Sequence, residues 1–186
     1  MTEAFDTLAG TLDHVWATLA GAVQNPEAPA RNPVFGTTRA DGSPTMRTVV
    51  LRAVDPVAGT LEFHTDTASS KVAETQRDPR GAFHIWDRDE ALQIRIAVTV
   101  THLSPTEAFE RWSAIPEGPR RGYGRAPQSG TRIQTYDGYS PGPDANRFTG
   151  FVCTAEAIET LLIDPGGHRR AEFLRASGWQ GAWLVP

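Results

Sequence analysis

The chain has 186 residues, of which 39% are hydrophobic and 22% charged, and a formal net charge of −4. This length and composition predict one globular domain with its own core, and the acidic balance argues against a general nucleic-acid-binding surface. No stretch approaches the about 20 apolar residues of a membrane span. Cys153 is the only cysteine, which excludes an internal disulfide and a Cys-based metal cage. Glu3 and Asp6 stand where an export signal would carry basic residues. We therefore expect a cytoplasmic protein.

Residues 1–25 predict an N-terminal helix. Apolar residues recur at spacings of three and four from Phe5 to Leu19, which gives one apolar face. The helix should end before the Pro-rich cluster at 25–29.

A β-rich region follows, in which apolar runs and alternating patterns predict strands separated by turn residues. The expected strands cover residues 34–39, 45–54, 61–64, 81–86 and 94–100, and later 148–154 and 158–163, with a helical turn at 155–157 and short segments at 168–174 and 183–185. In the third strand Leu61 and Phe63 alternate with Glu62 and His64.

Two shorter helices are expected between strands. Residues 69–77 read as a helix with serine at its start, and Ser104-Pro105-Thr106-Glu107 is a capping box that begins another. Residues 116–147 form a long Gly-, Pro- and Arg-rich loop of the kind that is usually functional, and residues 148–186 supply the C-terminal strands.

About six strands in antiparallel succession, without βαβ repeats, predict a mainly β fold: a small antiparallel barrel with peripheral helices, and a single domain over residues 1–186. The sequence contains no P-loop, dinucleotide fingerprint, His-Glu-x-x-His motif or nucleophile elbow. The five histidines lie far apart in the sequence, and we predict no metal site.

The only lysine of the chain, Lys71, lies in the first turn of the second expected helix, directly after Ser69 and Ser70. A helix dipole disfavours a cation there, whereas free N–H groups, two hydroxyls and an ammonium together suit a phosphate. A serine-capped surface helix with an incidental lysine is the alternative.

Arg47 and Arg52 flank an apolar run in the strand at 45–54, and charges beside a buried run need partners. Either they form salt bridges, for instance to Asp41 or Asp55, or at least one of them reaches the same anion as Lys71. Gln93 lies at the start of the strand with the clearest alternating pattern. Its amide either contacts a heterocyclic ligand or faces solvent.

At this point the residues resemble a known family. The runs Arg47-Thr48-Val49-Val50-Leu51-Arg52, His64-Thr65-Asp66, Ser69-Ser70-Lys71, Asp78-Pro79-Arg80 and Leu92-Gln93-Ile94-Arg95, followed by Gln128-Ser129, are similar in order and spacing to the pyridoxamine 5′-phosphate oxidase family. These are FMN-binding split barrels, and the resemblance implies a six-stranded antiparallel Greek-key split barrel for this chain.

The resemblance further implies a homodimer with FMN at its interface. The cofactor-binding residues that it implies are Arg47, Thr48, Val49, Val50 and Arg52 along the flavin and ribityl chain, His64, Thr65, Ser69, Ser70 and Lys71 around the phosphate, Gln93 at the isoalloxazine ring, and Gln128 and Ser129 from the partner subunit.

The substrate side departs from the family. The positions that bind the substrate's phosphate there fall on Arg111, Ile115 and Pro119, where the family has Tyr, Arg and Ser, and Ile and Pro cannot pair with a phosphate. His168 and Arg170, near the family's C-terminal Arg-x-His motif, are candidate substrate contacts, and no catalytic side chain is assigned.

The sequence therefore predicts a divergent flavoprotein, an FMN-dependent oxidoreductase acting on a small molecule. The alternatives are a genuine pyridoxamine or pyridoxine 5′-phosphate oxidase, a non-catalytic flavin-binding protein, and an interaction module that has lost the cofactor. Related barrels also bind deazaflavin F420 or heme.

Overall fold

The computed structural model describes residues 3–186, so that the first two residues of the expected 1–25 helix lie outside the described part. Within this described part, nine strands form one sheet. They are β1 (Val34–Thr38), β2 (Pro44–Thr48), β3 (Leu51–Asp55), β4 (Thr60–Asp66), β5 (Arg80–Asp87), β6 (Leu92–His102), β7 (Phe148–Leu162), β8 (Arg169–Leu174) and β9 (Gly181–Leu184). The helices are α1 (Leu8–Gln24), α2 (Ser70–Arg77), α3 (Pro105–Ala114) and α4 (Glu117–Arg120), with short 3₁₀ turns at 3–6, 29–31, 145–147 and 175–177.

The sheet is antiparallel throughout, in the order β2-β1-β5-β6-β7-β4-β3, and β8 and β9 extend it beside β7. The expected mainly β, antiparallel class with peripheral helices is confirmed. Strands β2 and β3 lie at opposite ends of the order, yet only two residues separate them in the chain. Three residue steps span about 10 Å, so the sheet must curl until its two ends nearly meet. The result is an open barrel.

The expected strand count and two expected elements are corrected. Residues 45–54 form two strands rather than one, because β2 pairs with β1 whereas β3 pairs with β4. The expected helical turn at 155–157 is instead a bulge within the long strand β7, where Ala97 pairs with Ala157 and Val98 with Ala155. The extra residue Glu156 bends the strand without breaking it. The sheet has nine strands in residues 3–186, against the about six expected, and β8 and β9 correspond to the short segments expected at 168–174 and 183–185.

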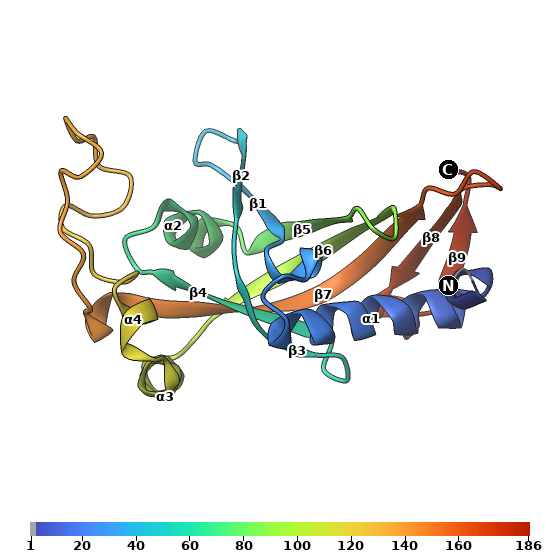
Figure 1. The fold of residues 1–186 in the computed structure, drawn as a ribbon, viewed down its shortest axis with the longest axis horizontal. Coiled ribbons are helices and arrows are strands. Elements are labelled where there is room, and N and C mark those ends of the chain that lie inside the picture. The colour runs from blue at the N-terminus through green and yellow to red at the C-terminus, as the bar shows by residue number, and fades with distance from the viewer. Residues whose placement is uncertain (1–2) are drawn as a thin grey trace.

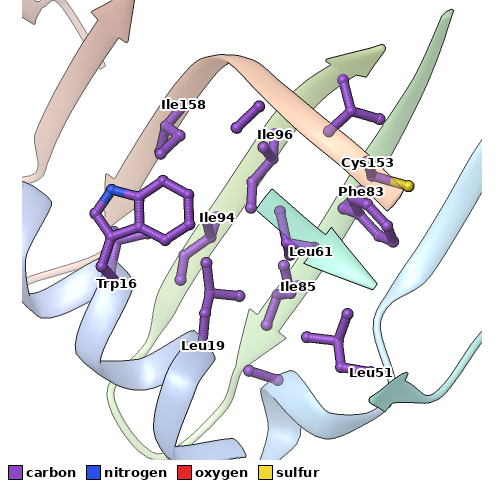
Figure 2. Packing of buried hydrophobic residues seen from close by; sticks show 14 of the residues in the cluster. Trp16, Leu19, Leu51, Leu61, Phe83, Ile85, Ile94, Ile96, Cys153 and Ile158 are labelled. Atoms are coloured by element: carbon purple, nitrogen blue, oxygen red, sulfur yellow. The ribbon is translucent and has the colours of Figure 1, made fainter. Parts of the chain in front are cut away.

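The core fills the concave side of the sheet, and α1 lies along it (Figure 1). Figure 2 shows Trp16 and Leu19 of α1 pointing at Ile94 and Ile96 of β6. Four phenylalanines, fully buried or nearly so, fill the middle of the barrel with ring centroids 4.9–6.0 Å apart, namely Phe35, Phe63, Phe83 and Phe151. This core fixes the strand ends that carry the candidate site.

Helices α2, α3 and α4 lie at the end of the sheet opposite the two chain termini, and the loop that follows α4 projects beyond that end (Figure 1). Helix α3 begins with the expected capping box, in which the Ser104 hydroxyl accepts from the Glu107 N–H and the Glu107 carboxylate accepts from the Ser104 N–H. None of the described helices is long and apolar enough to cross a membrane.

Candidate functional site

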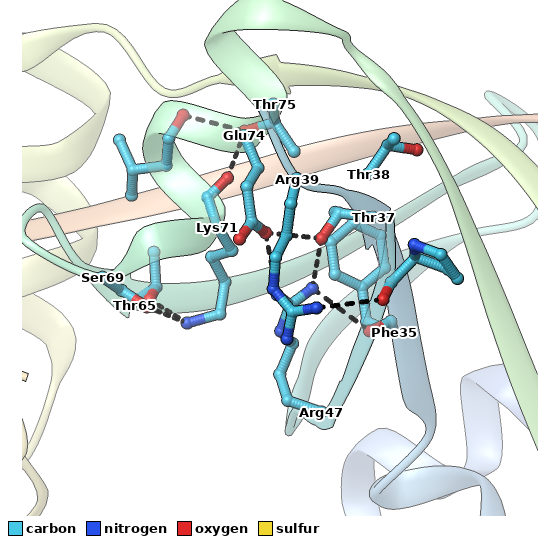
Figure 3. A network of polar contacts seen from close by, with 12 residues as sticks. Phe35, Thr37, Thr38, Arg39, Arg47, Thr65, Ser69, Lys71, Glu74 and Thr75 are labelled. Carbon is cyan, nitrogen blue, oxygen red and sulfur yellow. Dashed lines mark hydrogen bonds and ion pairs between the residues drawn. The ribbon is translucent and has the colours of Figure 1, made fainter. Parts of the chain in front are cut away.

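A lysine and two hydroxyls meet where β4 passes into α2 (Figure 3). The Lys71 Nζ donates to Thr65 Oγ1 at 2.9 Å and to Ser69 Oγ at 2.5 Å. The Ser69 hydroxyl makes no hydrogen bond that caps the helix. The expected serine cap is therefore absent, and the hydroxyl faces the ammonium instead.

Lys71 carries a charge that no carboxylate balances directly. Burial lowers its pKa, and the neighbouring Arg47 lowers it further, to about 8, against the opposing pull of Glu74 and Asp66. Within residues 3–186, Lys71 forms no ion pair, although Arg47 and Glu74 form one beside it. A part-buried ammonium with two hydroxyls beside it and no counter-ion has the donor set that a phosphate requires. The residues present thus fit a phosphorylated cofactor.

Arg47 is held rigidly beside this cluster. Its guanidinium donates to Glu74 Oε2 at 2.8 Å and to the Thr37 hydroxyl, and Thr37 in turn donates to the same carboxylate at 2.6 Å. Its partner is thus Glu74 on α2, neither Asp41 nor Asp55. The Ser70 hydroxyl also lies beside Glu74. The ion pair ties β2 to α2 and fixes the Arg47 side chain next to Lys71.

Residues 48–50 cross the opening of the barrel between β2 and β3. Thr48 is exposed, Val50 is half-buried and Val49 is buried, with its N–H donating to the Pro33 carbonyl at 3.0 Å. The crossing separates Arg47 from Arg52, which therefore lie on different strands. Arg47 binds Glu74 of α2, whereas Arg52 lines a cavity.

Asp66 fixes the turn that carries the lysine cluster. Its carboxylate accepts from the N–H groups of Ala68 and Gly124 at 2.8 Å each and from Arg147 at 2.7 Å. Burial raises its pKa, but these donors outweigh burial and hold the pKa below its ordinary value. Both ends of the long loop are thereby tied to the turn before α2.

The cavity has a volume of about 620 Å³ and lies between the end of α1, β3, β4, α3 and α4. It is lined by the four positions Arg52, Arg111, Ile115 and Pro119, together with Glu62 and His64. Arg111, Ile115 and Pro119, the three positions aligned with the family's substrate side, therefore lie together in this cavity. Among residues 3–186 no cluster of three or more His, Cys, Asp and Glu is arranged to hold a metal ion.

Glu62 is buried and His64 is half-buried, and both line the cavity. Arg111 donates to Glu62 through two nitrogens at 2.9 and 3.2 Å, and the His64 Nε2 lies 2.9 Å from Glu62 Oε1. Burial alone would raise the pKa of Glu62, but the bonds from His64 and Arg111 lower it to about 2. A carboxylate accepts only, so His64 donates from Nε2, and its buried Nδ1 has no hydrogen-bond partner among residues 3–186.

Gln93 does not lie near Lys71 within one chain. Thr75 of α2 contacts His102, at one end of β6, whereas Gln93 lies at the other end, about 30 Å of strand away. Gln93 instead pairs in register with Leu161, which pairs with Arg170 on β8. Two predicted residues from distant parts of the sequence, Gln93 and Arg170, thus share one end of the sheet.

The other predicted contacts are dispersed. Arg170 donates to Glu159 at 2.9 Å, and exposed His168 accepts from the Asp164 N–H at 3.2 Å. Gln128 and Ser129 are exposed in the loop beyond α4 and contact neither Lys71 nor the cavity of the same chain.

Sequence reasoning missed the acidic residues that organise the site. Glu62, Asp66 and Glu74 are all buried and each accepts from an arginine. One signal was present: Glu62 and His64 are two residues apart in a strand, which places them on the same face. No comparable pattern pointed to Arg31, which also lines the cavity.

Comparison with known proteins agrees with this geometry. Residues 13–104 match the family model described as pyridoxamine 5′-phosphate oxidase, FMN-binding domain. Residues 13–104 belong to this family. The match covers β1 to β6 and α2, and hence the lysine cluster.

Curated relatives are similar at low identity. Pyridoxine/pyridoxamine 5′-phosphate oxidases from Mycolicibacterium smegmatis and Pseudomonas putida are 31% and 29% identical over 119 and 118 residues, or 64% and 63% of this chain. The matches cover 50% and 54% of those proteins, so the chain spans about half the length of the curated relatives it matches.

Solved structures share the fold. A pyridoxamine 5′-phosphate oxidase-related, FMN binding protein from Nostoc punctiforme has a TM-score of 0.75 at 19% identity, over 93% of this chain and 96% of that one. PhzG from Burkholderia lata, in complex with tetrahydrophenazine-1-carboxylic acid, has a TM-score of 0.73 at 19% identity, over 95% and 91%. The likeness confirms the split-barrel fold.

Proposed function

We propose that the chain binds FMN and acts as an oxidoreductase on a small molecule. The observation that carries the proposal is the Lys71 ammonium, which meets two hydroxyls, Thr65 and Ser69, with Arg47 beside it and no carboxylate bonded to it. The phosphate of FMN would lie there, and the crossing at 48–50 would pass along the ribityl chain and ring. Membership of an FMN-binding family supports this.

In this proposal the chain's residues bind, orient and exclude water, while the flavin supplies the redox chemistry. Lys71 and Arg47 hold the phosphate, and Asp66 keeps the turn in place through three donors. The cavity lined by Arg52 holds the substrate next to the crossing.

The complete site is proposed to need two copies of the chain. Gln93 and the Gln128-Ser129 pair lie away from Lys71 within one chain, so a second subunit would bring them to the cofactor. His168 and Arg170 would then approach from the same subunit as Gln93, because Gln93 and Arg170 share one end of the sheet.

The test compares FMN with riboflavin, which lacks the phosphate, by quenching of flavin fluorescence. The wild type should bind FMN at least about tenfold tighter than riboflavin, a preference of about 1.4 kcal/mol or more. Lys71→Ala should remove that preference and leave riboflavin affinity unchanged. Arg88→Ala, an exposed change in the β5–β6 turn, is the control. Equal affinity for the two flavins in the wild type would refute the phosphate site.

Two alternatives have separate tests. A genuine pyridoxamine or pyridoxine 5′-phosphate oxidase would form pyridoxal phosphate, but Ile115 and Pro119 give the cavity no polar group at two of the aligned positions. A non-catalytic flavin-binding protein would hold FMN that no candidate substrate bleaches under anaerobic conditions.

A further inference from the structure

A histidine contacts the side chain of Gln93 on the face of the sheet that points away from the core. In β5 and β6 buried side chains alternate with exposed or half-buried ones, and His84 and Gln93 both belong to the second set. The His84 Nε2 lies 3.3 Å from Gln93 Oε1. The contact runs diagonally across the two strands, because Gln93 pairs in register with Trp86 and His84 pairs with Arg95.

This contact determines which way the Gln93 amide is turned. An amide oxygen only accepts, so the His84 Nε2 carries the proton and donates it. The amide NH₂ group of Gln93 is then directed away from His84, and among residues 3–186 it donates to no other side chain or carbonyl. Gln93 therefore offers two N–H donors, and no acceptor, to a ligand on this face.

The other polar residue beside His84 is engaged elsewhere. Arg95 donates to Glu159 of β7, and Arg170 of β8 donates to the same carboxylate oxygen at 2.9 Å. Glu159 thus holds both guanidiniums. Neither arginine competes with His84 for the Gln93 oxygen, so His84 alone orients this amide within the described residues 3–186.

We propose that His84 is a positioning residue for Gln93 and fixes its NH₂ group, rather than its oxygen, toward the flavin ring held by the partner subunit. This inference rests on the proposed function, in which Gln93 contacts that ring. A flavin ring accepts hydrogen bonds at its carbonyl oxygens, whereas an amide oxygen in the same place would repel them. Because the reduced ring carries more negative charge than the oxidised ring, a fixed donor favours the reduced form.

The test measures the two-electron reduction potential of bound FMN by equilibration with a reference dye. His84→Leu removes the donor at an exposed position of β5. The ratio of affinities for reduced and oxidised FMN should fall about tenfold, the size of one hydrogen bond, which lowers the potential by about 30 mV. His84→Gln keeps an N–H donor and should change this ratio less than about twofold. Arg88→Ala, in the β5–β6 turn, is the control and should behave as the wild type.

A double-mutant cycle separates positioning from a direct effect of His84 on the flavin. Gln93→Leu should lower the potential by itself, and adding His84→Leu to it should lower the potential no further, because the amide that His84 orients is gone. If His84→Leu has the same effect with and without Gln93, His84 does not act through the amide, and the inference is wrong.

Binding of oxidised FMN distinguishes this inference from the proposed function. His84→Leu should retain the preference for FMN over riboflavin, since the Lys71 cluster supplies it. If the wild type binds no FMN, the proposed function and the inference both fail. If the wild type binds FMN but His84→Leu has the same potential, the inference alone fails.

Discussion

The pH dependence of FMN affinity tests the lysine cluster most directly. Lys71 has a pKa of about 8 because it is buried and faces Arg47. A bound phosphate favours the charged ammonium and would raise this pKa toward or above its ordinary 10.5. The stabilisation that the ammonium gives to the complex is therefore full below about pH 8 and is lost as the pH rises above it.

The size of the effect follows from these two pKa values. Between pH 7 and pH 9 the fraction of Lys71 that is charged in the free protein falls about tenfold, whereas in the complex it stays near one. FMN affinity should thus fall about tenfold over this range. Glu74 and Asp66, which also face Lys71, have lowered pKa values and stay ionised throughout.

The assay is a fluorescence titration with FMN at pH 7, 8 and 9 and constant ionic strength. Lys71→Arg is the matched control, because a guanidinium stays protonated over this range, and its affinity should change less than about twofold. If the wild type binds FMN equally well at pH 7 and 9, the ammonium of Lys71 does not hold the phosphate, and the reasoning fails.

Three further predictions concern stability, each measured by urea unfolding. Glu62→Gln should lower the free energy of unfolding at pH 7 by about 2 kcal/mol, because it leaves His64 and Arg111 without their carboxylate. Since the pKa of Glu62 is about 2 in the folded protein, this difference should persist above pH 4.5 and shrink as the pH falls toward 2; a difference that does not change with pH would contradict it. Gly124→Ala should cost about 1–3 kcal/mol, because φ is +105° there and a Cβ would lie 2.4 Å from the Gly142 carbonyl; unchanged stability would be inconsistent with this loop geometry. Phe63→Ala should cost about 3–5 kcal/mol, since its ring is fully buried among three others, and a loss below about 1 kcal/mol would argue against this core.

Local patterns in the sequence were sufficient to predict much of the fold. The apolar alternation of β6 and the capping box of α3 appear in the structure where they were expected, because each depends on residues within a few positions of one another. The order of the short motifs was sufficient to predict the family, and the family-model match over residues 13–104 confirms it.

The break at residues 49–50 was not visible in the sequence. Val49-Val50-Leu51 reads as one buried strand, and only the pairing of β2 with β1 and of β3 with β4 shows that the chain crosses from one end of the sheet to the other. The bulge at Glu156 was missed for the same reason, since register depends on a partner strand that lies far away in the sequence.

The sequence by itself determined that Lys71 follows two serines at a helix start, and that arginines flank the crossing. Only the tertiary structure decided what each charge meets: Arg47 pairs with Glu74, Lys71 meets hydroxyls alone, and Arg31 joins Arg52 in one cavity. Charge interactions act through space and depend on burial, and neither distance nor burial can be read from positions along a chain.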